Sequence, residues 1–155
     1  MPGVTTRSLG RVLTRRLATQ RITAAGLPRG GDVVRLLTCV QSQDAPLAAW
    51  SIGLRTPRGA TYAGVLAEQA AGGWVRTHVL RPTWHLVAPE DLRWVQRLTG
   101  PKVEASMAGR HRGLGLDDVA LGRAVDALSG LLSGSVAVTR REVTAHFAAR
   151  GLPCS

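Results

Sequence analysis

Cysteine and long apolar runs are both scarce in this sequence. Its two cysteines, Cys39 and Cys154, lie far apart, which argues against a disulfide framework and favours a reducing compartment. No segment approaches the roughly 18 consecutive apolar residues that a membrane span needs. The N-terminal residues interleave arginines with apolar side chains, unlike the uninterrupted apolar stretch of an export signal. These absences argue against disulfide-rich, membrane-spanning and exported classes and predict a soluble, cytoplasmic protein.

Lysine and acidic residues are scarce as well. Of 20 basic residues only Lys102 is a lysine, and 10 acidic residues leave a formal net charge of +10. A GC-rich genome explains arginine in place of lysine, but it does not explain the twofold excess of basic over acidic residues. A surplus of this size, with a pI near 11.6, is typical of proteins that bind polyanions. The composition therefore predicts a nucleic-acid partner.

Apolar residues recur at the three- and four-residue spacing of amphipathic helices along most of the chain. This spacing, with helix start and stop signals, predicts helices over about 8–19, 32–44, 47–54, 60–71, 89–99, 102–112, 117–133 and 140–150. Pro46 is expected to end the second helix, and Gly100-Pro101 to separate the fifth from the sixth. Thr139 and Glu142 have the spacing of a capping box at the start of the last helix.

Between Trp74 and Val87 the period changes to two. The segments WVRTHVL and TWHLV alternate in polarity, and Arg81-Pro82 separates them, which predicts a β-hairpin. Helices followed by a two-stranded ribbon in a basic chain favour a mainly α fold with a β-hairpin, an α+β winged helix-turn-helix. We expect this domain over residues 1–112, with the hairpin at about 74–87. Residues 113–155 are expected to form the helical start of a second, incomplete winged-helix-like unit.

The stretch CVQSQDAP breaks the apolar rhythm of the second expected helix. On a helical wheel, Gln43 and Asp44 fall toward its apolar face and Gln41 lies on the border. Burying such groups without partners costs several kcal/mol, so either the helix stops at Gln41 and they face a cleft, or they form a satisfied network. The alternative is an ordinary helix end, whose polar side chains satisfy loose backbone groups before a proline.

The sequence from about Arg11 to Arg150 resembles a family of winged-helix DNA-binding proteins related to the crosslink-repair DNA glycosylases, the YcaQ-like family. The likeness rests on LTRRLATQRI, VVRLLTCVQSQD, LAAWSIGLRT, VRTHVLRPTWHLVAPEDLRWVQRLTGPKV and GLGLDD. The resemblance implies that the Gln-x-Gln motif of Gln41, Ser42 and Gln43 lies in an active-site cleft. It also implies that Thr83-Trp84-His85 corresponds to a hairpin segment near that cleft, which makes His85 a candidate site residue.

The chemistry implied by this resemblance suits modest side chains. A purine alkylated at N7 carries positive charge, so its glycosidic bond is already weakened and the leaving base needs little protonation. The protein then has to hold a water near C1′ and stabilise an oxocarbenium-like sugar. Glutamine cannot act as a general base, but the amide oxygens of Gln41 and Gln43 can orient that water. Asp44 can add negative charge or activate the water, but if it caps its own turn the glutamines act alone.

The candidate DNA contacts surround the expected hairpin. Arg76 and His78 share one face of its first strand, and Arg81 occupies its tip. Arg55, at the end of the third helix, is a further candidate. The alternative is a surface ribbon with routine arginines and a histidine bonded to backbone.

No metal or cofactor is expected, because Cys39, Asp44, His78 and His85 lack the short paired spacings of zinc motifs. The tryptophans at 74, 84 and 94 are expected in the core. The function predicted is a monofunctional DNA glycosylase, a monomer that acts on alkylated or crosslinked purines in double-stranded DNA. A non-catalytic winged-helix DNA-binding module or regulator, or an inactive truncated relative, is the rival.

Overall fold

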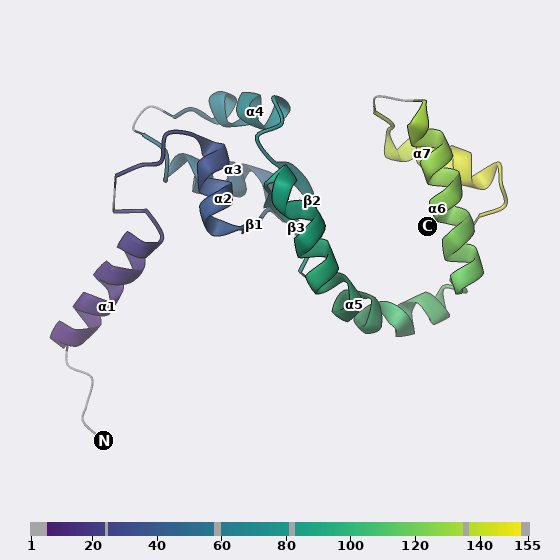
Figure 1. Ribbon diagram of the computed structural model, residues 1–155, viewed down its shortest axis with the longest axis horizontal. Coiled ribbons are helices and arrows are strands. Elements are labelled where there is room, and N and C mark those ends of the chain that lie inside the picture. The colour runs from purple at the N-terminus through teal and green to yellow at the C-terminus, as the bar shows by residue number, and fades with distance from the viewer. Residues whose placement is uncertain (1–5, 24, 58–59, 81–82, 135–136, 153–155) are drawn as a thin grey trace, which may run out of the picture. The chain divides into compact units, whose positions relative to one another are not determined.

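The computed structural model of the chain describes residues 6–23, 25–57, 60–80, 83–134 and 137–152. It is mainly helical, with a small antiparallel sheet, so the expected α+β class is confirmed (Figure 1). The elements in chain order are α1 (Thr6–Thr19), α2 (Gly30–Leu37), β1 (Cys39–Gln41), α3 (Ala45–Gly53), α4 (Tyr62–Ala70), β2 (Val75–Val79), β3 (Thr83–Val87), α5 (Pro89–Gly113), α6 (Asp118–Ser133) and α7 (Arg140–Ala148). The chain divides into two compact units, Met1–Val103 and Glu104–Ser155.

The first unit contains the sheet. Its strands lie in the order β1-β3-β2 and are all antiparallel to their neighbours. From α2 to β3 the elements run helix, strand, helix, helix, strand, strand, which is consistent with a winged helix. The hairpin of β2 and β3 confirms the strands predicted from the change of period.

The second helix is shorter than the sequence predicts. It ends at Leu37, because Thr38 takes a left-handed backbone conformation with φ of 64°. The next three residues pair with β3, with Cys39 opposite Val87, and these ladder hydrogen bonds replace the helical ones. The helical wheel that directed Gln43 and Asp44 toward the core is therefore wrong. Pro46 lies in the first turn of α3, where a missing backbone N–H costs nothing.

The α5 helix runs through the break that the sequence predicts at Gly100-Pro101. Its 25 residues include Pro101. Proline removes one helical hydrogen bond, but its fixed φ is compatible with a helix, so the helix can continue. The boundary between the two compact units, after Val103, follows shortly beyond this proline.

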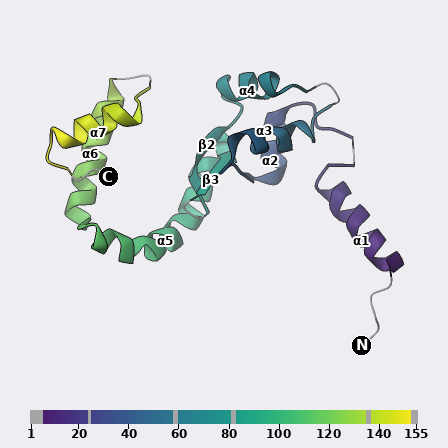
Figure 2. The ribbon, with the colours of Figure 1, turned by 180° about the vertical axis from the view of Figure 1, so that it is seen from behind.

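The two faces of the sheet pack on different elements. On one face, a core cluster joins the sheet to α2, α3 and α4, and the views in Figures 1 and 2 show α2 and α3 beside the strands. This cluster consists of Val33, Val34, Val40, Ala48, Ala49, Ile52, Val65, Trp74, Leu86 and Ala88. On the other face, Val79 and Val87 pack with Val95 of α5. The sheet is thus held rigidly from both sides.

Glu68 of α4 ties that helix to the start of α2. Its two carboxylate oxygens accept hydrogen bonds from the backbone N–H groups of Gly30 and Gly31, at 2.9 and 3.0 Å. These N–H groups have no partner within their own helix, and Arg29 supplies no side-chain cap. A Cβ at position 30 would come within 2.9 Å of both Glu68 and Ile52, so only glycine fits this close approach.

The second unit contains the end of α5 and two capped helices, α6 and α7. Asp117 accepts a hydrogen bond from the N–H of Ala120 at 2.7 Å, and the predicted capping box of Thr139 and Glu142 is present. The His146 ring also contacts the carbonyl of Ala127 in α6 at 3.0 Å. Neither α6 nor α7 has a fully buried residue within the described chain.

Candidate active site

The Gln41-Ser42-Gln43 segment stays registered against β3 beyond the end of β1. The backbone N–H of Ser42 donates to the carbonyl of Trp84 at 2.7 Å. In return, the N–H of Trp84 donates to the side-chain oxygen of Gln43 at 3.2 Å. Ser42 is only 1% exposed, whereas Gln41 and Gln43 are exposed. The segment therefore presents two amide side chains on either side of a buried serine.

Arg76 of β2, on the other strand of the hairpin, holds this segment in place through hydrogen bonds. Its Nη2 donates to the Ser42 carbonyl at 2.9 Å, and its Nε donates to the Ser42 hydroxyl at 3.1 Å. The same guanidinium lies over the ring of Trp84, 4.4 Å from the ring centre. Among side chains, only the planar guanidinium of arginine can donate hydrogen bonds in two directions and also stack on an aromatic ring. Arg76 thus couples the backbone of the Gln-x-Gln segment to the hairpin.

His78 completes a stack on the same face of the sheet. Its ring centre lies 4.0 Å from that of Trp84, with an angle of 39° between the planes. His78 pairs directly with Trp84 in the register, two residues from Arg76, so the predicted shared face of Arg76 and His78 is confirmed. Trp84 is half-buried between them and Trp74 is buried as expected, but Trp94 is 47% exposed on α5, so the core position expected for it is wrong.

His85 lies on the opposite face of β3, directly across from Gln41. It is only 4% exposed, and its Nδ1 contacts the carbonyl of Thr83 at 2.9 Å. Directly opposite residues of an antiparallel pair have their Cβ atoms about 5 Å apart. The register therefore brings two predicted site residues together, with the histidine as the buried member.

Asp44 caps the helix that follows the motif. Its Oδ1 accepts a hydrogen bond from the backbone N–H of Leu47 at 2.9 Å, which makes it the N-cap of α3. In this arrangement the carboxylate is engaged by the helix cap, which leaves the positioning of the water to the glutamines alone. The carboxylate remains exposed and beside Gln43, so it adds negative charge at the edge of the motif.

The side chain of Arg55 forms its hydrogen bonds inside the first unit. It is 7% exposed, and its Nε donates to the carbonyl of Gln20 at 2.8 Å. Its Nη1 donates to the carbonyl and hydroxyl oxygens of Ser51 at 2.7 and 2.9 Å. Burial lowers the pKa of the guanidinium. Because these donors are engaged within the protein, this structure does not present Arg55 to a DNA phosphate. Arg81, the other candidate beside the hairpin, lies outside the described residues.

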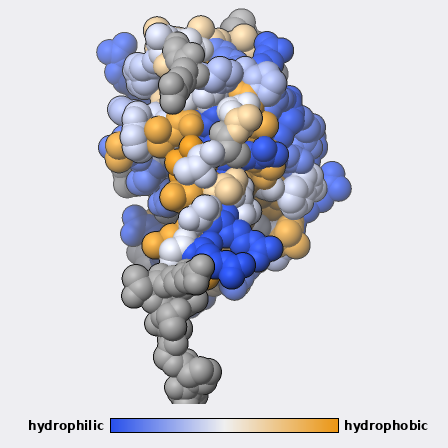
Figure 3. Space-filling model, turned by 90° about the vertical axis from the view of Figure 1, so that its left-hand side faces the viewer, coloured by the Kyte–Doolittle hydropathy of each residue, from blue (hydrophilic) through white to orange (hydrophobic). Residues whose placement is uncertain are grey.

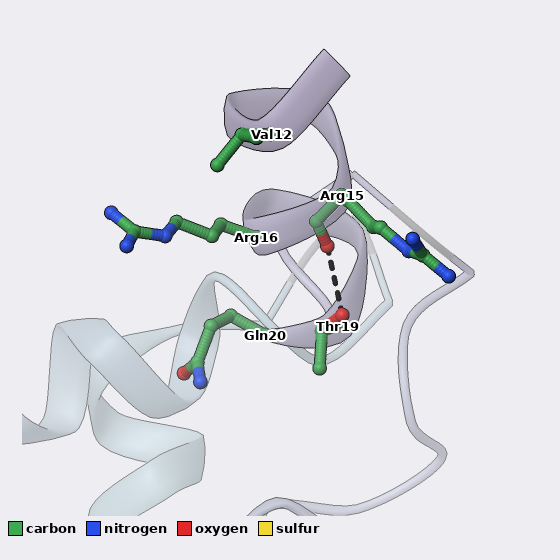
Figure 4. A pocket seen from close by; sticks show the side chains of 5 residues that line it. All are labelled: Val12, Arg15, Arg16, Thr19 and Gln20. Carbon is green, nitrogen blue, oxygen red and sulfur yellow. Dashed lines mark hydrogen bonds between the residues drawn. The ribbon is translucent and has the colours of Figure 1, made fainter. Parts of the chain in front are cut away.

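An open groove on α1 offers basic side chains away from the motif. It has a volume of about 480 Å³ and is lined by Val12, Arg15, Arg16, Thr19 and Gln20. Figure 4 shows Arg15 and Arg16 extending in opposite directions, with the Thr19 hydroxyl donating to the Arg15 carbonyl at 2.8 Å. Both arginines are exposed, as expected of solvated helix faces.

Sequence reasoning missed the contact between Arg76 and Ser42. The two residues are 34 positions apart, and they meet because β1 and β2 pair with the two edges of β3. The polar serine in the centre of the Gln-x-Gln motif was the available signal, because a buried hydroxyl needs a partner. Among the described residues, no cluster of three or more His, Cys, Asp or Glu side chains is arranged to hold a metal. In the same part of the chain, no helix is both long and apolar enough to cross a membrane.

Comparison with known proteins gives one match. A family model described as DNA glycosylase AlkZ-like matches residues 34–154, a range that includes the Gln-x-Gln segment and the whole sheet. No curated protein and no solved structure matches the chain.

Proposed function

Because the chain belongs to the DNA glycosylase AlkZ-like family, we propose that it hydrolyses the N-glycosidic bond of alkylated or crosslinked purines in double-stranded DNA. One observation supports this most: Gln41 and Gln43 flank a serine that Arg76 and Trp84 hold in place. Excision of a cationic base needs a positioned water and a favourable field more than it needs a strong base. Two exposed amides, of which that of Gln43 is hydrogen-bonded to the hairpin, suit that task.

The proposed roles follow from the contacts of each side chain. Gln41 and Gln43 orient the attacking water with their amide oxygens. The oxygen of Gln43 already accepts from the Trp84 N–H, and its second lone pair remains for water. Asp44, although it caps α3, adds negative charge beside a developing oxocarbenium ion. His85 lies directly opposite Gln41 in the strand register and acts as a positioning residue.

DNA binding is the second part of the proposal. A net charge of +10 favours a duplex through its phosphates, with a strong dependence on salt. His78 is exposed on the hairpin, and Arg81 follows it three positions later in the sequence. We assign both to the duplex contact, and Arg76 mainly to holding the motif. A cytoplasmic location fits these roles and the free thiol of Cys39.

The rival function is a non-catalytic DNA-binding module. The observation that favours it is the engagement of Asp44 in the helix cap, since no other carboxylate adjoins the motif in sequence. Such a module would bind the duplex through the same basic surface and leave the lesion intact.

Incubation with a duplex that contains N7-methylguanine, followed by alkali to cleave abasic sites, separates these functions. We expect cleavage at the lesion by the wild type and its loss in Gln41→Ala/Gln43→Ala. Gln96→Ala, an exposed glutamine of α5, is the matched control and should retain activity. Salt-sensitive binding without lesion-dependent cleavage would leave the binding module. An absence of binding even at low salt would indicate an inactive family member.

A further inference from the structure

Three polar side chains are buried in the part of the chain that the structure describes, and they belong to Ser42, Arg55 and His85. Burial is the exception for such groups, and hydrophilic residues cover much of the face drawn in Figure 3. Ser42 is bonded to Arg76, and Arg55 is bonded to backbone carbonyls, so both have partners that account for their burial. His85 differs, because only one of its two ring nitrogens has a hydrogen-bond partner within the described residues.

The bonded nitrogen of His85 fixes the tautomer of the ring. Its Nδ1 lies 2.9 Å from the carbonyl oxygen of Thr83, and a carbonyl can only accept, so Nδ1 carries the hydrogen and donates. In the neutral ring the lone pair therefore belongs to Nε2. Gln43 accepts from the Trp84 N–H of the same peptide group at 3.2 Å. Two predicted site residues thus hold the two ends of one peptide group, which fixes the ring beside the motif.

Gln41 faces His85 from the adjacent strand. The neighbouring residues Ser42 and Trp84 form a ladder hydrogen bond at 2.7 Å, so Gln41 and His85 are a non-hydrogen-bonded pair, the kind whose side chains lie closest. Gln41 is exposed and His85 is buried, so the amide lies on the solvent side of the ring. A water that donates one hydrogen to the Gln41 oxygen can donate the other to Nε2.

We propose that His85 is the general base of the excision reaction, and that its Nε2 takes a proton from the water that Gln41 orients. This inference rests on the proposed function and extends the positioning role of His85. Glutamine cannot accept that proton, and the Asp44 carboxylate is engaged in the cap of α3. His85 is the group with an available lone pair that the register places directly against the motif.

The proton transfer accompanies attack on the sugar. The water oxygen forms a bond to C1′ with one of its lone pairs, and the glycosidic C1′–N bond breaks. The electron pair of that bond neutralises the cationic purine, which leaves as a neutral base. One water hydrogen moves to Nε2, and the other stays on the new sugar hydroxyl. The imidazolium keeps its Nδ1–H bond to the Thr83 carbonyl, which stabilises its charge, and then releases its extra proton to solvent.

The side chains around His85 leave the ring free to accept a proton. Those paired with it in register, and those beside it on the same face of β3, are uncharged: Gln41, Thr77, Thr83 and Val87. The titratable groups that β1 and α5 bring to this face are Cys39 and Asp91. Burial, and then the charge of Asp91, raise the pKa of the Cys39 thiol. No cation adjoins His85 among these residues, so none opposes the imidazolium.

The pH dependence of single-turnover excision tests this role. With saturating protein and a duplex that contains N7-methylguanine, corrected for spontaneous base loss, the wild-type rate should fall about tenfold between about pH 8 and 5, where histidine changes charge. His85→Asn keeps a donor for the Thr83 carbonyl but supplies no base. It should lower the rate at neutral pH at least about a hundredfold, remove the pH dependence and change duplex affinity by less than about threefold.

Thr77→Val is the matched control, because it removes a hydroxyl from the other neighbour of His85 and leaves the base in place. It should retain the wild-type rate and pH profile, and circular dichroism checks that both variants keep their helices. The wild-type profile needs no substitution, so the test holds even if His85→Asn fails to fold.

Three outcomes would overturn the role of His85 and leave the proposed function intact. They are a flat pH profile of an active wild type, an unchanged rate in a folded His85→Asn, and an equal loss in Thr77→Val. A wild type that binds duplex without excising N7-methylguanine would overturn the proposed function and this role together.

Discussion

The two compact units of this chain differ in how much they bury. Of the apolar residues that the structure describes as buried, all but one belong to the first unit, where the sheet is packed on both faces. Among the described residues of the second unit, Leu152 is the single buried apolar residue, and α6 and α7 rely on caps and surface contacts. The candidate site lies in the unit with the core. A core of close-packed side chains fixes backbone positions, and the Gln-x-Gln segment depends on such fixed positions.

The two units also stabilise their helices in different ways. In the first unit, Glu68 bridges two helices that are far apart in sequence. In the second, Thr139 and Glu142 close a cap within one helix turn. Long-range ties of the first kind determine the geometry of a site, whereas local caps stabilise a helix and leave its neighbours free.

The largest expected effect comes from the core of the first unit. Ile52→Ala should lower the free energy of unfolding by about 3 kcal/mol, because it removes a fully buried side chain and leaves a cavity. All four tryptophans lie in the first unit, so urea unfolding followed by tryptophan fluorescence measures this unit alone. Leu128→Ala, in the second unit, should change that transition by less than about 0.5 kcal/mol. Equal losses from both substitutions would mean that the units unfold as one.

A smaller loss is expected from the bridge between α4 and α2. Glu68→Ala leaves two backbone N–H groups without acceptors and should cost about 2 kcal/mol in the same fluorescence transition. Glu142→Ala, which removes half of a capping box, should cost helix content seen by circular dichroism and leave the fluorescence transition unchanged. A fluorescence transition that shifts with Glu142→Ala and not with Glu68→Ala would contradict this difference between the two units.

Sequence predicts the local features of both units and misses the long-range ones. The hairpin, the α6 helix and the Thr139–Glu142 cap depend on neighbouring residues and were predictable. The β1 strand has three residues and exists because it pairs with β3, more than forty positions away, so its period could not reveal it. The hold of Arg76 on Ser42 has the same origin, since it depends on that pairing. The sequence motif identified the candidate glutamines, but the contacts that hold their segment in place are formed only by the fold.

The smallest expected effects concern one carboxyl group in each unit. A hydrogen bond from Arg35, 2.6 Å long, lowers the pKa of Glu90, and hydrogen bonds from Thr139 lower the pKa of Glu142. A folded pKa below the unfolded one gives stability that is present above the unfolded pKa and lost as the pH falls through the folded pKa. Both groups should therefore titrate below their ordinary range in an NMR titration of side-chain carboxyl carbons.

Two substitutions test the causes of these shifts separately. Arg35→Met should raise the pKa of Glu90 toward its ordinary range and leave that of Glu142 unchanged. Thr139→Ala should raise the pKa of Glu142 part of the way, because the backbone N–H of residue 139 still donates to it, and leave that of Glu90 unchanged. If either substitution changed the pKa of both carboxyl groups, the cause would be the long-range electrostatic field and not the individual hydrogen bonds.

The central claim is that the rigid hairpin of the first unit holds the Gln-x-Gln segment for base excision, with Arg76 as the connection. Single-turnover excision of N7-methylguanine from a duplex, measured at saturating protein together with duplex affinity, tests it most directly. For Arg76→Ala we predict an excision rate at least tenfold lower, about 1.4 kcal/mol in activation free energy, with the dissociation constant changed by less than about threefold. Weaker binding with an unchanged saturated rate, or no excision by the wild type, would contradict it.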